Sequence, residues 1–169
     1  MSDNTLPTDV PRKLVIGWFS FTCCEGCTIL LSELLNDHLL EWKKVVEFRH
    51  LKTLKTKNEL RDLDVAFVEG AISSETQAEE LRKIRENSKY LVGIGACACT
   101  GKPSASRNEF DDEKLNYKIL WYFNQFNYSE KVKKLDEIVK VDDQVPGCPM
   151  NADLFLKAVE KYLKQFNII

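Results

Sequence analysis

The sequence shows no excess of either charge, which excludes one class of partner. Its 169 residues include 24 Lys and Arg against 26 Asp and Glu, for a formal net charge of -2 at pH 7. Proteins that bind nucleic acid or anionic membranes carry a basic patch or a basic excess. We therefore expect no nucleic-acid partner.

Long hydrophobic runs and a secretory pattern are also missing. No apolar run approaches the roughly 18 residues of a membrane span, so we expect no direct membrane insertion. Residues 1–13 are polar and contain two prolines, without the charged and then apolar pattern of a signal peptide. We predict that residues 1–12 form a flexible segment and that the chain is cytoplasmic.

Histidine is scarce, whereas cysteine is not. The two histidines, His38 and His50, lack metal-ligand spacing, and we interpret both as surface or core residues. A single domain of this length (1–169) buries roughly 68–70% of its unfolded surface and needs no disulfides. The six cysteines need another explanation, because clustered cysteines in a reducing compartment bind metal or do redox chemistry.

Short β-rich apolar runs alternate with longer stretches of helical period. This alternation predicts an α/β fold, a parallel sheet with helices on its faces. We expect strands at 14–19, 45–48, 64–69, 90–95 and 138–141. Ser74 to Gln77 form a capping box that opens a helix ending near Asn87.

Helical spacing predicts which side chains face the core. In the helix after Cys27 these are Ile29, Leu30, Leu34, Leu35 and Leu39. In the helix after the capping box they are Ala78, Leu81 and Ile84. In the last helix they are Leu154, Phe155, Ala158, Val159 and Tyr162. Between 101 and 128 we expect one short helix.

Four cysteines follow the predicted strands. Cys24 and Cys27 come after the first strand, Cys97 after the fourth and Cys148 after the last. In an open parallel sheet, ligands bind beyond the carboxyl ends of the strands, where the loops converge. Four thiolates can therefore meet at one point, although they come from distant parts of the sequence.

Soft sulfur ligands select zinc or an iron–sulfur cluster. Structural zinc sites place their ligands in two close pairs, whereas here one C-x-x-C pair is joined by two isolated cysteines. The spacing favours one 4Fe-4S cluster bound by Cys24, Cys27, Cys97 and Cys148. We interpret Cys23 and Cys99 as buried or supporting residues.

Three motifs carry a resemblance to a known family. They are Cys24-Glu25-Gly26-Cys27, Gly95-Ala96-Cys97-Ala98 and Pro146-Gly147-Cys148-Pro149, with Val68-Glu69-Gly70 and Arg107-Asn108 in support. In this order they resemble the small, electron-transferring subunit of cytoplasmic NiFe hydrogenases. That subunit is similar to the 20 kDa cluster-bearing subunit of respiratory complex I.

The resemblance implies a flavodoxin-like fold, with helices on both faces of an open parallel sheet, that holds a proximal 4Fe-4S cluster on the four cysteines. It also implies that hydrogen chemistry takes place in a NiFe large subunit. This oxidoreductase subunit would then pass electrons between that subunit and a further carrier, an iron–sulfur protein or a flavoprotein. The adjacent Cys23 and Cys24 resemble the tandem pair of complex I, which keeps a complex I-like oxidoreductase as an alternative.

Other functions stay open on the residues alone. They are a zinc-stabilised interaction module and a thiol–disulfide enzyme that uses Cys24 and Cys27. A flavin-binding flavodoxin is disfavoured, because the first loop offers cysteines in place of a Ser/Thr/Gly-rich phosphate cradle. Glu25, between two proposed ligands, is either a solvated loop residue or a proton carrier.

An aromatic group lies in the irregular stretch between the second and third cysteine motifs. It comprises Tyr117, Trp121, Tyr122, Phe123, Phe126 and Tyr128. These side chains either belong to the core or form a hydrophobic contact with a large subunit.

Overall fold

The computed structural model of the protein describes residues 11–111 and 117–169. Its strands are β1 (Leu14–Ser20), β2 (Val46–Leu51), β3 (Leu63–Glu69), β4 (Ser88–Ile94) and β5 (Asp143–Val145). Its helices are α1 (Gly26–Val45), α2 (Glu75–Glu86), α3 (Gly95–Thr100), α4 (Tyr117–Gln125) and α5 (Ala152–Gln165), with 3-10 turns η1 (Ser104–Glu109) and η2 (Leu135–Glu137).

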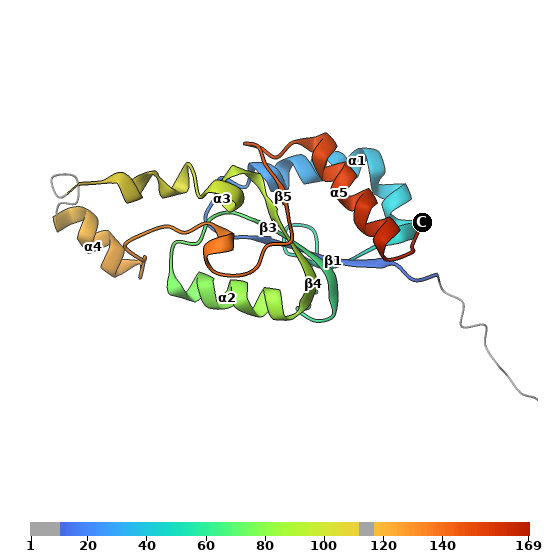
Figure 1. Ribbon diagram of the computed structural model, residues 1–169, viewed down its shortest axis with the longest axis horizontal. Coiled ribbons are helices and arrows are strands. Elements are labelled where there is room, and N and C mark those ends of the chain that lie inside the picture. Colours follow the sequence, from blue (N-terminus) through green and yellow to red (C-terminus); the bar gives the residue numbers. More distant parts are fainter. Residues whose placement is uncertain (1–10, 112–116) are drawn as a thin grey trace, which may run out of the picture.

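All five strands form one parallel sheet in the order β2-β1-β3-β4-β5 (Figure 1). This is the flavodoxin-like strand order, whose binding crevice lies at the carboxyl edge where the order reverses between β1 and β3. The predicted α/β class and the flavodoxin-like sheet are therefore confirmed.

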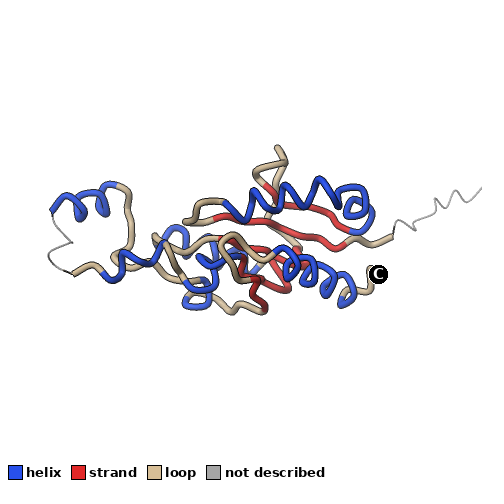
Figure 2. Tube along the Cα trace, turned by 90° about the horizontal axis from the view of Figure 1, so that it is seen from above, coloured by secondary structure: helices blue, strands red, loops and turns tan. Residues whose placement is uncertain are grey.

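Helices cover both faces of the sheet. α1 and α5 lie together on one face, and α2 covers the other (Figures 1 and 2). Trp18, Phe67 and Phe155 join the sheet to the α1/α5 layer, with ring centroids 5.4 to 6.3 Å apart. Ala78, Leu81 and Ile84 of α2 pack on the opposite face, as their spacing predicts. The two layers hold the carboxyl edge of the sheet in place.

The last strand was predicted in the wrong place. Ile138, Val139 and Val141 have the composition of a strand, but they are not paired and pack against the α2 side of the core. Pairing with β4 starts only at Asp143, opposite Val92. Apolar, β-branched residues here cover a face of the sheet instead of extending it.

The predicted inward faces of the first and last helices need correction. Of the predicted α1 residues, Leu35 is buried and Leu30 and Leu34 are partly buried, but Ile29 and Leu39 are exposed. The helix also buries Leu31 and Trp42. A leucine-rich helix offers several faces with helical spacing, so periodicity alone does not select the buried one. Leu154 of α5 is also exposed, whereas Phe155, Val159 and Tyr162 are buried.

A projection leaves the body of the molecule at the carboxyl edge of the sheet. It contains η1 and α4 and extends beyond α3 (Figures 1 and 2). We call its described residues, 104–111 and 117–129, the aromatic arm. The short helix expected between 101 and 128 is present there as α4.

Two remaining expectations concern the ends and the surface of the chain. The predicted flexible segment falls mostly on residues 1–10, which lie outside the described residues, while Arg12 binds the buried Asp64 carboxylate at 2.9 Å. Within 11–111 and 117–169, no helix combines the length and apolar character needed to cross a membrane. The cytoplasmic location stays a prediction.

Candidate metal centre

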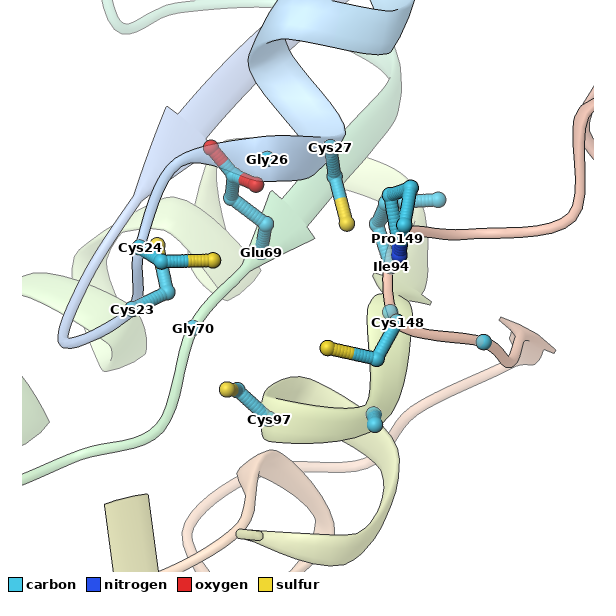
Figure 3. Close-up of a pocket in the computed structure, with 13 residues that line it drawn as sticks. Cys23, Cys24, Gly26, Cys27, Glu69, Gly70, Ile94, Cys97, Cys148 and Pro149 are labelled. Carbon is cyan, nitrogen blue, oxygen red and sulfur yellow. The ribbon is translucent and has the colours of Figure 1, made fainter. Parts of the chain in front are cut away.

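Five of the six cysteines line one pocket at the carboxyl edge of the sheet (Figure 3). Its lining is Cys23, Cys24, Gly26, Cys27, Glu69, Gly70, Ile94, Gly95, Ala96, Cys97, Gly147, Cys148 and Pro149. The four cysteines predicted as ligands are thus brought together. Cys99 lies outside this lining.

Each predicted ligand is placed by the end of a strand. Cys24 is exposed in the loop after β1, and Cys27 is buried in the first turn of α1. Cys97 is buried in α3, which follows β4 directly, and Cys148 is exposed in the loop after β5. Parallel strands deliver all four to the same edge, which is why residues distant in sequence meet there.

Glycines give the sulfur atoms room. Gly95 has φ +78°, and a Cβ at this position would lie 2.6 Å from Cys27 Sγ. Gly147 has φ +122°, and its Cβ would lie 2.5 Å from the carbonyl oxygen of Pro149. L-residues rarely adopt such angles, so both positions require glycine. The close approach of the Gly95 backbone to the Cys27 thiol therefore depends on glycine at this position.

Three of the sulfur atoms accept weak hydrogen bonds from the protein. The Met150 amide donates to Cys27 Sγ at 3.4 Å, and the Glu25 amide donates to Cys23 Sγ at 3.4 Å. The Ser104 hydroxyl donates to Cys97 Sγ at 3.7 Å. Donors directed at sulfur are the means by which proteins tune metal–thiolate groups.

A buried carboxylate, which sequence reasoning missed as a site residue, also faces the pocket. Glu69 ends β3, is 1% exposed, and accepts hydrogen bonds from the hydroxyls of Ser20 (2.7 Å) and Thr28. The signal that could have revealed it is a carboxylate at the end of an otherwise apolar buried strand, directly before Gly70. Its hydroxyl partners fix its orientation beside the thiols.

The pocket disfavours bare thiolates. Burial raises the pKa of Cys27 to about 11 and that of Cys23 to about 12, and the Glu69 carboxylate acts in the same direction. The lining contains no Lys, Arg or His that would offset the negative charge. A C-x-x-C thiol used for disulfide exchange needs a lowered pKa, so this environment argues against a thiol–disulfide enzyme.

The donor set fits a metal-containing group. Thiolates at neutral pH here need positive charge from a bound metal, which displaces their protons. Among the described residues, no group of three or more His, Cys, Asp or Glu side chains is arranged to hold a single metal ion. Instead, the sulfur atoms of Cys27, Cys97 and Cys148 surround a shared space (Figure 3). Thiolates placed around one space are ligands that an iron–sulfur cluster or a zinc ion can use.

The other residues considered in the sequence analysis lie outside the pocket lining. Cys99 is buried and its thiol lies 3.6 Å from the Gly93 carbonyl oxygen, where burial raises its pKa to about 11. Glu25 is exposed and does not line the pocket, so the geometry adds no support to a proton-carrying role. His50 is buried with Nδ1 3.0 Å from the Trp18 carbonyl oxygen, and His38 stacks on Trp42.

A family model matches most of the chain. Residues 24–162 match the family described as NADH ubiquinone oxidoreductase, 20 Kd subunit. The match begins at Cys24 and includes the remaining three predicted ligands.

Curated relatives carry the names of hydrogenase subunits. One subunit of the F420-non-reducing hydrogenase of Methanothermobacter marburgensis is 28% identical, over 90% of this chain and 54% of that protein. Sulfhydrogenase 2 subunit delta of Pyrococcus furiosus is 32% identical, over 82% of this chain and 57% of that protein. NAD-reducing hydrogenase HoxS subunit delta of Cupriavidus necator is 27% identical, over 94% of this chain and 82% of that protein. The chain thus spans little more than half the length of the first two.

A solved structure shows the same fold over nearly the whole chain. It is a crystal structure of an NAD+-reducing NiFe hydrogenase in the H2-reduced state, one chain of which is 25% identical with a TM-score of 0.79. The similarity covers 91% of this chain and 93% of that chain.

Proposed function

Because this chain belongs to the family of the 20 kDa subunit of NADH ubiquinone oxidoreductase, we propose that it binds one 4Fe-4S cluster and transfers electrons as the small subunit of a NiFe hydrogenase. In this proposal Cys24, Cys27, Cys97 and Cys148 are the ligands, and hydrogen chemistry takes place in a separate large subunit. The observation that carries it is the pocket into which three strand ends bring these four thiols. The hydrogenase names of the relatives support the choice of complex.

The residues of this chain provide the environment of the cluster. A bound iron–sulfur cluster supplies one-electron chemistry. The Met150 amide and the Ser104 hydroxyl are directed at two of the ligand sulfurs. Hydrogen bonds, burial and charge of this kind set the reduction potential of such a group.

The partner subunit is proposed to cover the open side of the pocket. Cys24 and Cys148 are exposed there, as are Ile29 and Leu154 in the first turns of α1 and α5. Exposed apolar side chains next to an electron-transfer group are typical of a docking face. The electrons would leave toward a further carrier, an iron–sulfur protein or a flavoprotein.

A complex I-like oxidoreductase is the second candidate, favoured by one observation. Cys23 lines the same pocket as Cys24, so a tandem pair is available as well as the C-x-x-C pair. The two candidates differ in one ligand, which is Cys27 in the first and Cys23 in the second. Substitution of these two residues therefore separates them.

The test starts with anaerobic purification of the tagged chain from its native host, followed by measurement of iron, acid-labile sulfide, zinc and nickel. We expect about four iron and four sulfide per chain, and nickel in a large subunit that copurifies. Iron without nickel would favour the complex I-like candidate. Zinc, or a folded chain without metal, would contradict electron transfer.

Single variants identify the ligands. We expect Cys27→Ala to lose the cluster signal in the electron paramagnetic resonance spectrum and most of the bound iron. Cys23→Ala should keep the iron, with a shifted potential because a group beside the cluster has changed. Cys99→Ala is the matched control, since this cysteine is buried but outside the pocket. Loss of iron from Cys23→Ala with retention in Cys27→Ala would reverse the assignment.

A further inference from the structure

The aromatic arm exposes a group of large apolar side chains that the core does not use. Six of the thirteen exposed large hydrophobic residues in the described part of the chain lie on it between residues 117 and 128. They are Tyr117, Leu120, Trp121, Tyr122, Phe126 and Tyr128, and we call them the aromatic surface. α4 buries none of its residues, so the core interpretation of these aromatics is wrong.

The arm is attached to the body by specific polar contacts. The Asn108 side chain donates to the Val132 carbonyl oxygen at 2.7 Å and accepts from the Val132 amide at 2.8 Å. The Arg107 guanidinium donates to the Ser73 carbonyl oxygen of the body at 3.5 Å. Within the arm, it donates to the Ser129 carbonyl oxygen at 2.8 Å and lies 4.5 Å from the ring centroid of Phe123, which joins the two described stretches of the arm to each other. These are the Arg and Asn of the motif that supported the family resemblance.

The aromatic rings also order one another. Tyr122 stacks on Phe126 with an interplanar angle of 8° and a centroid distance of 6.2 Å, and Trp121 meets Tyr122 edge to face at 5.1 Å. A surface that is already ordered loses little conformational entropy when a partner binds. The arm is thus ordered before any partner binds, and its apolar side is uncovered, as expected of a docking element.

The arm begins at the cysteine pocket. Ser104, its first residue, donates to the Thr22 carbonyl oxygen at 3.2 Å and to Cys97 Sγ at 3.7 Å. From there the arm extends past the carboxyl ends of the strands (Figures 1 and 2). A subunit that lies over the exposed Cys24 and Cys148 at this edge is therefore next to the arm.

The chemistry of the aromatic surface fits a protein. Tyr and Trp are enriched at protein interfaces, where the ring is buried and the hydroxyl or indole N–H finds a polar partner. A membrane-binding helix would carry several basic residues on its polar face, whereas α4 contains a single one, Lys118. Nucleic acid would require more positive charge still.

We propose that the aromatic surface binds the large subunit of the hydrogenase, the same subunit that covers the cysteine pocket. This inference rests on the proposed function and adds to it a named contact. Trp121, Tyr122 and Phe126 are its central residues, because their rings contact one another in sequence on α4 and the turn after it. The subunit would present an apolar recess to these three rings.

The test compares two variants of the tagged chain in its native host. The first is Trp121→Ser, Tyr122→Ser and Phe126→Ser combined; the control is Leu40→Ser, which removes an exposed apolar side chain on α1. Both are scored by iron per chain and by the nickel-containing large subunit that copurifies, identified by mass spectrometry. The triple variant should keep its iron, while the amount of large subunit that copurifies with it falls at least about tenfold. The control should keep both the iron and the large subunit.

Three results would overturn the docking inference. The triple variant could retain the large subunit at the level of the control. The unsubstituted chain could elute as a dimer that the triple variant converts to a monomer, which would assign the surface to a second copy. It could also bind liposomes through these residues. Absence of iron from a chain that still copurifies with its large subunit would instead contradict the cluster and leave the docking inference supported.

A cross-linking measurement keeps the inference testable if the triple variant fails to fold. Trp121→benzoylphenylalanine places a photoreactive ring at the centre of the surface. Irradiation of the intact complex should join residue 121 to the large subunit. Cross-links to another copy of this chain, or to no protein while the complex remains intact, would overturn the inference.

Discussion

At the scale of single residues, Gly95 allows the backbone to approach a proposed cluster ligand. An added methyl group would lie 2.6 Å from Cys27 Sγ, and the positive φ costs an L-residue about 1–2 kcal/mol. We expect Gly95→Ala to displace the Cys27 thiol and to lower the iron content of the purified chain several-fold. Iron analysis and urea unfolding measure the two effects separately.

Gly93→Ala is the matched control for this prediction. Gly93 lies two residues earlier, in β4, and an added Cβ would meet Val141 Cγ1 at 3.7 Å, an ordinary contact. This variant should bind iron like the unsubstituted chain. Equal iron in the Gly95 and Gly93 variants would show that the close approach to Cys27 does not matter for the site.

The residues of the site differ in how far the sequence predicts them. The four cysteines could be found because parallel strands end at one edge, so residues that follow different strands must meet. Their ligand role stays a prediction until metal is measured. Glu69 was missed, because the apolar run before it does not tell whether the last side chain points into a pocket or to solvent. Cys23 and Cys99 look alike in sequence, yet the structure places only Cys23 in the pocket lining.

At the scale of elements, the aromatic arm depends on Asn108 for its attachment. Asn108→Ala removes two hydrogen bonds to the Val132 backbone, worth about 1–3 kcal/mol of local stability. We expect amide hydrogen exchange in residues 117–128 to become faster while the sheet keeps its protection. Asn124→Ala, an exposed residue on α4, is the control. Unchanged exchange in the Asn108 variant would mean that the Arg107 contacts hold the arm without it.

Elements that are covered on both sides were the best predicted. Every residue of β3 is buried, and the apolar run at 65–68 within it is typical of a central strand of a parallel sheet. The strand expected at 138–141 failed because the same apolar composition serves residues that cover the α2 side of the sheet without pairing. The buried face of α1 was predicted only in part, because its leucines satisfy more than one helical stripe. A hydrophobic pattern identifies a strand or a helix face reliably only where one structural arrangement alone is compatible with that pattern.

At the scale of the whole molecule, the fold is built largely apart from the pocket. One core joins the sheet to α1 and α5 and another joins it to α2, and of the pocket cysteines only Cys27 belongs to either. We therefore expect the iron-free chain to keep its secondary structure and to unfold cooperatively at a lower temperature. For a chain of this size each kcal/mol lost corresponds to about 2–4 °C.

Circular dichroism of the iron-loaded chain, the chelated chain and Cys27→Ala provides this measurement. The far-ultraviolet spectra should agree, and the two iron-free samples should melt together below the loaded one, because a group bound only to the folded state stabilises it. Collapse of the helical signal on chelation would show instead that the metal is needed for folding.

The division of the proposed ligands between buried and exposed positions sets an order of events during biogenesis. Cys27 and Cys97 line the floor of the pocket, while Cys24 and Cys148 stand at its open side, and all four positions exist only once β1, β4 and β5 are paired. The sheet must form first, because only then do the four cysteines lie together. The proposed cluster must then enter through the open side of the pocket. A subunit that docks on that side closes the entrance. In this proposal, a chain that met its partner before it took up the cluster would be trapped without metal.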